Sequence, residues 1–145
     1  HTAGTVNDVS ILCSLDLNRS LYTLTNTQLA ESTTLDGEDL ASTLLGQEQR
    51  SRRQPIFWRR PPDRPGTATI DNPDLAARQG RWKFYVNYDG SDPQLYDLSA
   101  DVAESNNLAG THTSVSRRLH RAIRQWNAGL PPDAGDPQWD NTAVP

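Results

Sequence analysis

Several residue types that often define a protein class are scarce or absent in this sequence of 145 residues. Methionine is absent and cysteine occurs once, as Cys13, which excludes an internal disulfide and any zinc site built from several cysteines. No apolar run approaches the roughly 20 residues of a membrane-spanning helix, so we expect no membrane partner. Because the sequence also lacks an initiator methionine and a basic-then-apolar leader, we expect a piece of a longer polypeptide.

Apolar side chains are also few, with 34% hydrophobic and 7% aromatic residues. A chain of this length normally buries roughly 70% of the surface that it exposes when unfolded, which is enough for a core of its own. The lean apolar content favours a loop-rich structure or a segment that packs on a partner.

Acidic residues outnumber basic ones, 18 to 14, which gives a net charge of −4 and an isoelectric point near 5.2. Such a chain lacks the broad basic face that dominates nucleic-acid affinity, so we expect no nucleic-acid partner. Its cations are thirteen arginines and one lysine, Lys83. Arginine grips sulfate, phosphate and carboxylate with paired hydrogen bonds, but a GC-rich genome also replaces lysine by arginine, and both interpretations stay open.

The first third of the chain, residues 1–54, has the pattern of a helical connector. Residues 5–13 are β-branched and apolar, which predicts a short strand. Asp16 is placed to cap a helix over 17–25, and a second short helix follows the Asp36-Gly37 turn. From this second helix we expect three leucines to point inward: Leu40, Leu44 and Leu45.

Residues 55–131 have the pattern of a small sheet and a covering helix. Strands are expected at 55–60, on both sides of a Gln79-Gly80 turn, and at 94–98, and a helical turn at Asp101–Glu104. An apolar stripe predicts an amphipathic helix over 113–128. The fold class is therefore α+β, with about four antiparallel strands packed by a C-terminal helix. Residues 132–145, rich in Pro, Gly and Asp, are expected to be a disordered tail.

No known catalytic pattern is visible, since the sequence has no glycine-rich phosphate loop, no H-E-x-x-H and no G-x-S-x-G. His112 and His120 are eight residues apart, about 12 Å along a helix, which is too far for a paired metal ligand, and we expect both at the surface. Cys13 lies in an apolar stretch and is expected to be a core cysteine rather than a nucleophile.

One cluster suits a ligand. Six arginines crowd residues 50–64 together with Phe57 and Trp58. Arginine beside an aromatic ring is typical of a surface that stacks sugars and holds anions, and also of single-strand nucleic-acid platforms. The alternative is a solvated linker whose charge balances the acidic residues 31–39.

The order of short motifs resembles the later half of formylglycine-dependent sulfatases. H-T-x-G-x-V at residues 1–6 is followed by V-S-I-L-C-S-L-D-L at 9–17, L-D-G-E-D-L at 35–40 and P-I-F-W at 55–58. The more specific block is similar to the C-terminal signature of the arylsulfatase and N-acetylgalactosamine-6-sulfatase types. Its matching residues here are Arg78, Gly80, Trp82, Lys83, Leu95, Tyr96, Asp97, Leu98, Asp101, Glu104, Asn107 and Leu108.

The resemblance implies an alkaline-phosphatase-like parent enzyme in which this chain is the C-terminal portion. Residues 1–54 would then end the catalytic domain, and the N-terminal catalytic domain of the same polypeptide would be the partner. The family makes its formylglycine nucleophile in a C-x-P/A-x-R motif, whereas Cys13 is followed by Ser-Leu-Asp. The calcium ligands of the family also lie upstream. We therefore expect no catalytic residue, metal ligand or cofactor in this chain, and calcium and formylglycine in the parent.

The same resemblance implies a sulfated carbohydrate or aryl sulfate as substrate and a periplasmic or secreted protein. If the chain contributes to the substrate cleft, the best rim candidates are Trp58, Arg59 and Arg60, because an indole and arginine forks suit a sulfated sugar. Two alternatives stay open: a stand-alone, non-catalytic module that binds acidic polysaccharide, and the C-terminal part of a related phosphoester hydrolase.

Overall fold

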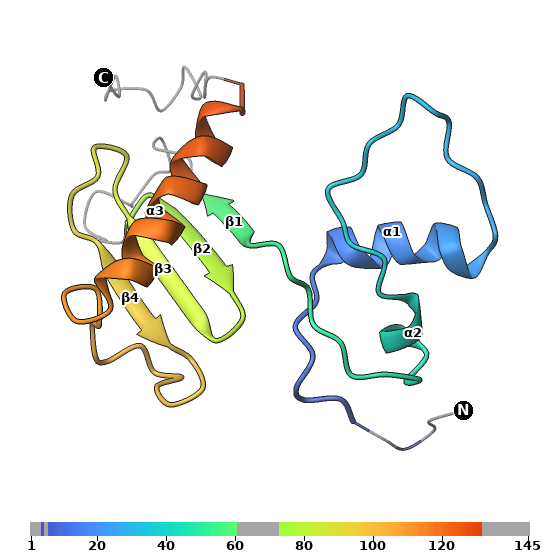
Figure 1. Cartoon of the computed structure of the whole chain (residues 1–145), viewed down its shortest axis with the longest axis horizontal. Helices are drawn as coiled ribbons and strands as arrows, with labels where there is room; N and C mark the ends of the chain where they lie inside the picture. Colours follow the sequence, from blue (N-terminus) through green and yellow to red (C-terminus); the bar gives the residue numbers. More distant parts are fainter. Residues whose placement is uncertain (1–3, 5, 61–72, 132–145) are drawn as a thin grey trace, which may run out of the picture. The chain divides into compact units, whose positions relative to one another are not determined.

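The computed structural model describes residue 4, residues 6–60 and residues 73–131, so the expected tail at 132–145 lies outside the described residues. The chain divides into a first unit, His1–Ile56, and a second unit, Phe57–Pro145, and each is described by itself. The elements, in chain order, are α1 (Ser14–Leu24), α2 (Ala41–Leu44), β1 (Ile56–Arg59), β2 (Leu75–Gln79), β3 (Trp82–Val86), β4 (Gln94–Asp97) and α3 (Thr113–Ala128) (Figure 1).

In the first unit, α1 begins three residues earlier than the sequence predicts. Its N-cap is Cys13, and Asp16 lies within the first turn. The Asp16 carboxylate reaches back and accepts a hydrogen bond from the Cys13 backbone N–H at 2.9 Å. This is the acidic half of a capping box, so the prediction of Asp16 as the N-cap is wrong.

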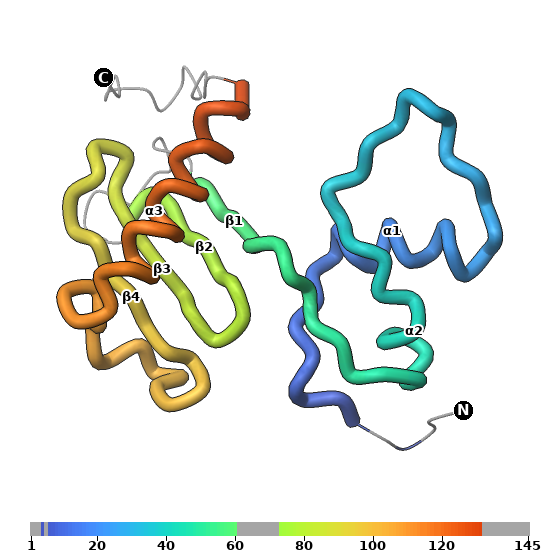
Figure 2. The backbone as a smooth tube through the Cα atoms, in the orientation of Figure 1, coloured from blue at the N-terminus to red at the C-terminus, as the bar shows by residue number. Residues whose placement is uncertain are grey.

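The loop after α1 returns to the one-turn helix α2, and Figure 2 follows this path along the backbone. Leu40 is fully buried as predicted, whereas Leu44 and Leu45 are 40% and 49% exposed, so the inward prediction is wrong for these two. The predicted strand is also absent from the described part of residues 5–13. The Ile11 carbonyl accepts a bond from the Arg52 N–H, but no strand ladder forms around this contact.

The second unit is a four-stranded sheet in the order β1-β2-β3-β4. β2 and β3 form an antiparallel hairpin whose loop is Gly80-Arg81, at the turn that the sequence predicts. Gly80 has φ +57, a conformation that glycine adopts without strain and that two-residue hairpins require. β3 also pairs antiparallel with β4, with Phe84 opposite Leu95.

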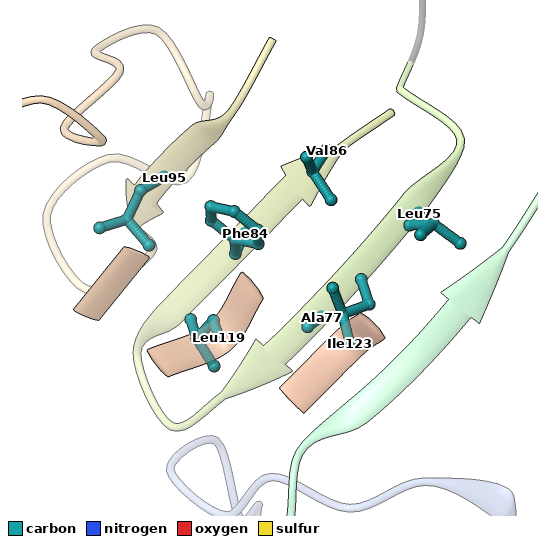
Figure 3. Packing of buried hydrophobic residues seen from close by; sticks show 7 residues of the cluster. All are labelled: Leu75, Ala77, Phe84, Val86, Leu95, Leu119 and Ile123. Carbon is teal, nitrogen blue, oxygen red and sulfur yellow. The ribbon is translucent and has the colours of Figure 1, made fainter. Parts of the chain in front are cut away.

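The helix α3 covers one face of this sheet, and the apolar core lies between them (Figure 3). Alternate residues of β3 face the core, so Phe84 and Val86 are fully buried. Leu119 and Ile123, one helical turn apart, contribute the helix side. The buried cluster consists of Leu75, Ala77, Phe84, Val86, Leu95, Leu119 and Ile123.

The segment between β4 and α3 departs from the sequence prediction. Asp101–Glu104 forms a turn rather than a helical turn, and Glu104 has φ +56. Asp101 accepts bonds from the backbone N–H groups of Ser105 and Asn106, so it organises a loop instead of a helix start. None of the helices in the described residues is long and apolar enough to cross a membrane.

Candidate functional site

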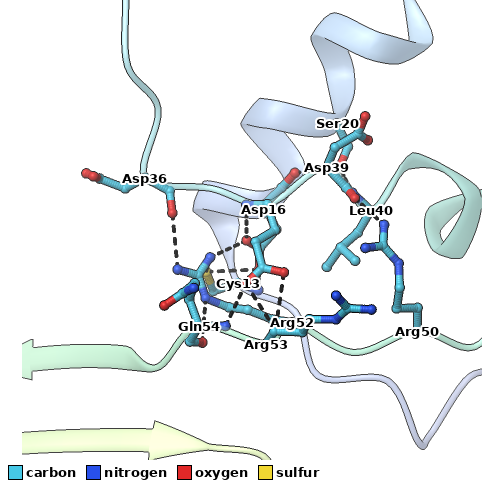
Figure 4. Close-up of polar contacts among 11 residues, drawn as sticks. Cys13, Asp16, Ser20, Asp36, Asp39, Leu40, Arg50, Arg52, Arg53 and Gln54 are labelled. Carbon is cyan, nitrogen blue, oxygen red and sulfur yellow. Dashed lines mark hydrogen bonds and ion pairs between the residues drawn. The ribbon is translucent and has the colours of Figure 1, made fainter. Parts of the chain in front are cut away.

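A buried carboxylate organises the first unit. Asp16 has no exposed surface, and its two oxygens accept bonds from the backbone N–H groups of Cys13 and Glu38 at 2.9 and 2.8 Å (Figure 4). One oxygen also pairs with the guanidinium of Arg52. Burial acts to raise the pKa of Asp16, but the hydrogen bonds from Glu38 and Cys13, helped by Arg52, outweigh it and lower this pKa. Asp16 is therefore ionised when buried.

The Arg52 guanidinium joins three segments around this carboxylate. It donates to the carbonyls of Asp36 and Gln54 at 3.1 and 3.0 Å, besides pairing with Asp16. Arg52 itself is 9% exposed. A buried guanidinium shared between a carboxylate and two carbonyls holds α1, the following loop and the chain leading to β1 in one arrangement.

The loop beside this ion pair approaches the start of α1 very closely. A Cβ atom added at Gly37 would lie 2.0 Å from the carbonyl oxygen of Leu15, so only glycine fits here. The next residue, Glu38, accepts the backbone N–H groups of Arg53 and Gln54 at 3.0 and 2.6 Å. All the hydrogen bonds described for Asp16, Arg52 and Glu38 join groups within the first unit. The cluster therefore has a structural role, which is to hold the segments of this unit together.

Cys13 is half-buried at this cluster and is not the core cysteine that the sequence predicts. Its thiol donates a hydrogen bond to the Asp16 carboxylate at 3.3 Å, and Cys13 is the N-cap residue of α1. In the residues that the structure describes, no group of three or more His, Cys, Asp and Glu side chains is arranged to hold a metal ion. The role of calcium stays a prediction about the longer protein.

A second polar cluster lies in the second unit, on the face of the sheet opposite the core. The Lys83 ammonium is 2.5 Å from one oxygen of Glu104, and the Tyr85 hydroxyl donates to the other oxygen at 2.7 Å. Lys83 and Tyr85 flank the buried Phe84 and point the other way, as the strand alternation predicts. Sequence reasoning placed Glu104 in a helical turn and missed this contact, because the positive φ of Glu104 is not visible in the sequence.

The charges of this cluster are mutually stabilised. Burial acts to lower the pKa of Lys83, but its hydrogen bonds with Glu104 and Tyr85 outweigh burial and raise this pKa. Burial raises the pKa of Tyr85, and the neighbouring carboxylate adds to the effect. At neutral pH Lys83 is therefore an ammonium and Tyr85 a neutral phenol, and both donate hydrogen bonds to Glu104.

The two histidines of the second unit differ in exposure. His112 is exposed, as predicted, with its ring 5.0 Å from that of Trp82. His120 is half-buried against Phe84, and its Nε2 has no hydrogen-bond partner among the described residues, so the prediction of a surface position is wrong for His120. The ring centroids of Phe84 and His120 are 6.0 Å apart, and a Cβ added at Gly90 would lie 3.7 Å from Nε2.

The three predicted rim residues lie on and after the edge strand β1, where their side chains differ in availability. Trp58 is 46% exposed. Arg59 donates to the carbonyl of Pro131 at 3.3 Å, and Arg60 forms an ion pair with Asp74 at 3.4 Å. The structure thus leaves the indole exposed while both guanidiniums have partners in the chain, and the rim role stays a prediction.

Comparison with known proteins finds sequence similarity to a sulfatase. No protein-family model matches. The chain is 32% identical over 128 residues to an N-acetylgalactosamine-6-O-sulfatase of Bacteroides thetaiotaomicron, an alignment that covers 79% of this chain and 23% of the relative.

Solved structures agree with this match. A structure from work on the metabolism of multiple glycosaminoglycans by Bacteroides thetaiotaomicron has a TM-score of 0.58 and 29% identity, over 78% of this chain and 24% of that protein. A 2-O glycosaminoglycan sulfatase shares the fold, with a TM-score of 0.55 and 20% identity over 88% of this chain and 28% of that protein. The chain spans about a quarter of the length of these proteins, and sulfatase homology covers its region.

Proposed function

We propose that this chain is the C-terminal portion of a sulfatase, a hydrolase of sulfuric esters on sulfated carbohydrates. The observation that carries the proposal is the 32% identity to the N-acetylgalactosamine-6-O-sulfatase over 128 residues. The sheet covered by α3 agrees with it, because the solved sulfatases share this fold at TM-scores above 0.5. We also propose a periplasmic or secreted location, as the resemblance to sulfatases implies.

In this proposal the chain completes the fold, while the chemistry belongs to an N-terminal catalytic domain of the same polypeptide. Formylglycine and calcium, the groups expected in that domain, would supply the nucleophile and stabilise charge on the sulfuryl oxygens. One feature of the sequence supports this division: Cys13, the single cysteine, is followed by Ser-Leu-Asp and does not match the C-x-P/A-x-R motif.

The substrate proposal follows from the relatives. One relative acts on 6-O-sulfated N-acetylgalactosamine, and a solved neighbour belongs to the metabolism of glycosaminoglycans. For this chain we propose a sulfated sugar of the same chemical class. Trp58 would contribute a stacking surface at the rim, since its exposed indole offers an apolar face to a sugar ring.

The test is expression of the whole reading frame that contains this sequence, followed by sulfate release from a glycosaminoglycan that carries 6-O-sulfated N-acetylgalactosamine. We expect sulfate release by the whole protein and none by residues 1–145 alone. Phosphate release from matched phosphoesters at a higher rate would favour the phosphoester hydrolase instead. A reading frame without an upstream C-x-P/A-x-R motif, combined with salt-sensitive binding of heparin by residues 1–145, would favour the polysaccharide-binding module.

A further inference from the structure

The side of α3 that faces away from the sheet carries positive charge alone. Arg117, Arg121 and Arg124 follow the i, i+4, i+7 spacing that places side chains on one helical face, and all three are exposed. We call these three residues the arginine face. Leu119 and Ile123, which are fully buried against the sheet, lie on the opposite side of the helix (Figure 3). No aspartate or glutamate occurs in α3, so the helix itself does not offset this charge.

The arginine face also has no partner elsewhere in the described part of the chain. Its three guanidiniums form no hydrogen bond or ion pair with another described residue. Other arginines pair with a carboxylate, and these ion pairs are Arg50–Glu48, Arg52–Asp16, Arg60–Asp74 and Arg81–Asp97. Like charges one helical turn apart repel each other, and a bound anion would remove this repulsion. The face therefore suits a ligand that carries negative charge.

The residue type and its spacing favour a sulfated polymer as this ligand. A guanidinium binds sulfate and carboxylate through paired hydrogen bonds, which a lysine ammonium does not form. Arg117 and Arg124 are seven residues apart, about 10 Å along the helix axis, so one small anion does not contact both. A chain with repeated anionic groups can bind all three arginines at once. Nucleic acid is disfavoured, because the whole chain has a net charge of −4 and lacks a broad positive field.

We propose that the arginine face binds a sulfated polysaccharide chain, with its guanidiniums on successive sulfate or carboxylate groups. This proposal rests on the proposed function, because it takes the polymer from the substrate class named there. Charge complementarity between three unpaired arginines and a sulfated polymer is the argument for this occupant. The competing occupants are a nucleic acid and an acidic segment of the same polypeptide, such as residues 132–145, which contain Asp133, Asp136 and Asp140.

The first experiment measures the affinity of the whole protein for a chondroitin sulfate that carries 6-O-sulfated N-acetylgalactosamine, over a series of salt concentrations. The face variant combines Arg117→Gln, Arg121→Gln and Arg124→Gln, which removes the charge and keeps a good helix former at each position. The control variant replaces three exposed arginines outside the face in the same way, by Arg53→Gln, Arg81→Gln and Arg118→Gln. Because both variants lose three positive charges, the comparison separates the position of the charge from its amount.

We expect the face variant to bind at least about tenfold more weakly than the wild type at low salt, because three surface ion pairs are lost. The slope of log Kd against log salt concentration should also fall by about two to three, since each arginine–anion contact releases counterions. The control variant should bind within about twofold of the wild type. Equal affinities of the wild type and the face variant, or equal losses in both variants, would overturn the proposal.

Two further measurements test the competing occupants. Double-stranded DNA should displace the polysaccharide poorly at an equal concentration of negative charge, and equal displacement would show a general polyanion surface and overturn the proposal. Without polysaccharide, the face variant should melt no lower than the control variant. A melting temperature several degrees lower would mean that the arginines pair with acidic groups of the polypeptide, which would also overturn it.

The outcomes separate this proposal from the proposed function. Sulfate release from a small aryl sulfate tests the sulfatase assignment without the polymer. A protein that releases sulfate, but whose face variant binds the polysaccharide as the wild type does, would retain the proposed function and overturn the binding surface. Binding that depends on the arginine face in a protein without sulfatase activity would do the reverse.

Discussion

The carboxylate of Asp16 and the guanidinium of Arg52 form an ion pair inside the first unit, across 36 residues of sequence. Both side chains are buried, and they also bond to the Cys13 thiol and to backbone groups of Cys13, Asp36, Glu38 and Gln54. In a unit with few buried apolar side chains, this network joins the segments that a hydrophobic core would otherwise hold. Breaking it leaves an unpaired buried charge.

Arg52→Ala is therefore expected to destabilise the first unit by about 3–5 kcal/mol, the usual cost of removing one partner of a buried pair. The measurement is hydrogen exchange of the Glu38 amide, which donates to Asp16 and should lose most of its protection. The matched control is Arg53→Ala, at the exposed neighbouring position, for which we expect less than about 1 kcal/mol. Equal effects of the two substitutions would contradict a structural role for the pair.

The same pair predicts acid sensitivity. Because the pKa of Asp16 is lowered in the folded state, its contribution to stability is present above the ordinary value of 3.8 and is lost as the pH falls through the folded pKa. Protection of the Glu38 amide should therefore decline below about pH 4. If the protection of the Glu38 amide stayed constant down to pH 2, the stability of this contact would not depend on an ionised Asp16 carboxylate.

Gly37→Ala is expected to destabilise the first unit by about 3 kcal/mol, because its Cβ would lie 2.0 Å from the carbonyl oxygen of Leu15. Gly110→Ala is the control, since an added Cβ there meets no atom within 4 Å. Urea unfolding would compare the two, monitored by hydrogen exchange of the α1 amides for Gly37→Ala and of the α3 amides for Gly110→Ala, because Gly110 lies in the second unit. A neutral Gly37→Ala would mean that the loop does not approach α1 this closely.

The cluster of Lys83, Tyr85 and Glu104 predicts alkaline sensitivity of the second unit. The pKa values of Lys83 and Tyr85 are raised above 10.5 and 10.0, so their contribution is fully present below these values and is lost as the pH rises through the folded pKa values. Thermal unfolding followed by tryptophan fluorescence should show a falling melting temperature above about pH 10. Glu104→Gln should lessen the fall of the melting temperature with rising pH. If the melting temperature fell equally steeply in this variant, groups outside the cluster would cause the alkaline sensitivity.

Trp58→Ala tests the rim role in the whole protein. Because the indole is 46% exposed, we expect a KM several-fold higher for a polymeric sulfated sugar and little change for a small aryl sulfate. The same comparison for Arg59→Ala is harder to interpret, since this side chain bonds to the Pro131 carbonyl. Equal effects of Trp58→Ala on both substrates would remove Trp58 from the cleft.

Local patterns were sufficient to predict most of the second unit. The alternation from Trp82 to Val86, the glycine of the hairpin and the apolar stripe of α3 each depend on neighbours within a few residues. Such signals act through strand and helix geometry and need no distant partner. The sheet, its hairpin and its covering helix are accordingly visible in the sequence.

The tertiary structure alone decided the first unit and the polar contacts. Asp16 has the sequence signature of an N-cap, but it lies in the first turn because Arg52 and the Glu38 amide, 36 and 22 residues away, surround its carboxylate. Glu104 leaves its expected helical turn to bond with Lys83 and Tyr85. Periodicity predicts which residues share a face, but it does not specify what covers that face. The leucines of α1 therefore remain exposed, while distant hydrogen bonds stabilise the buried polar side of the helix.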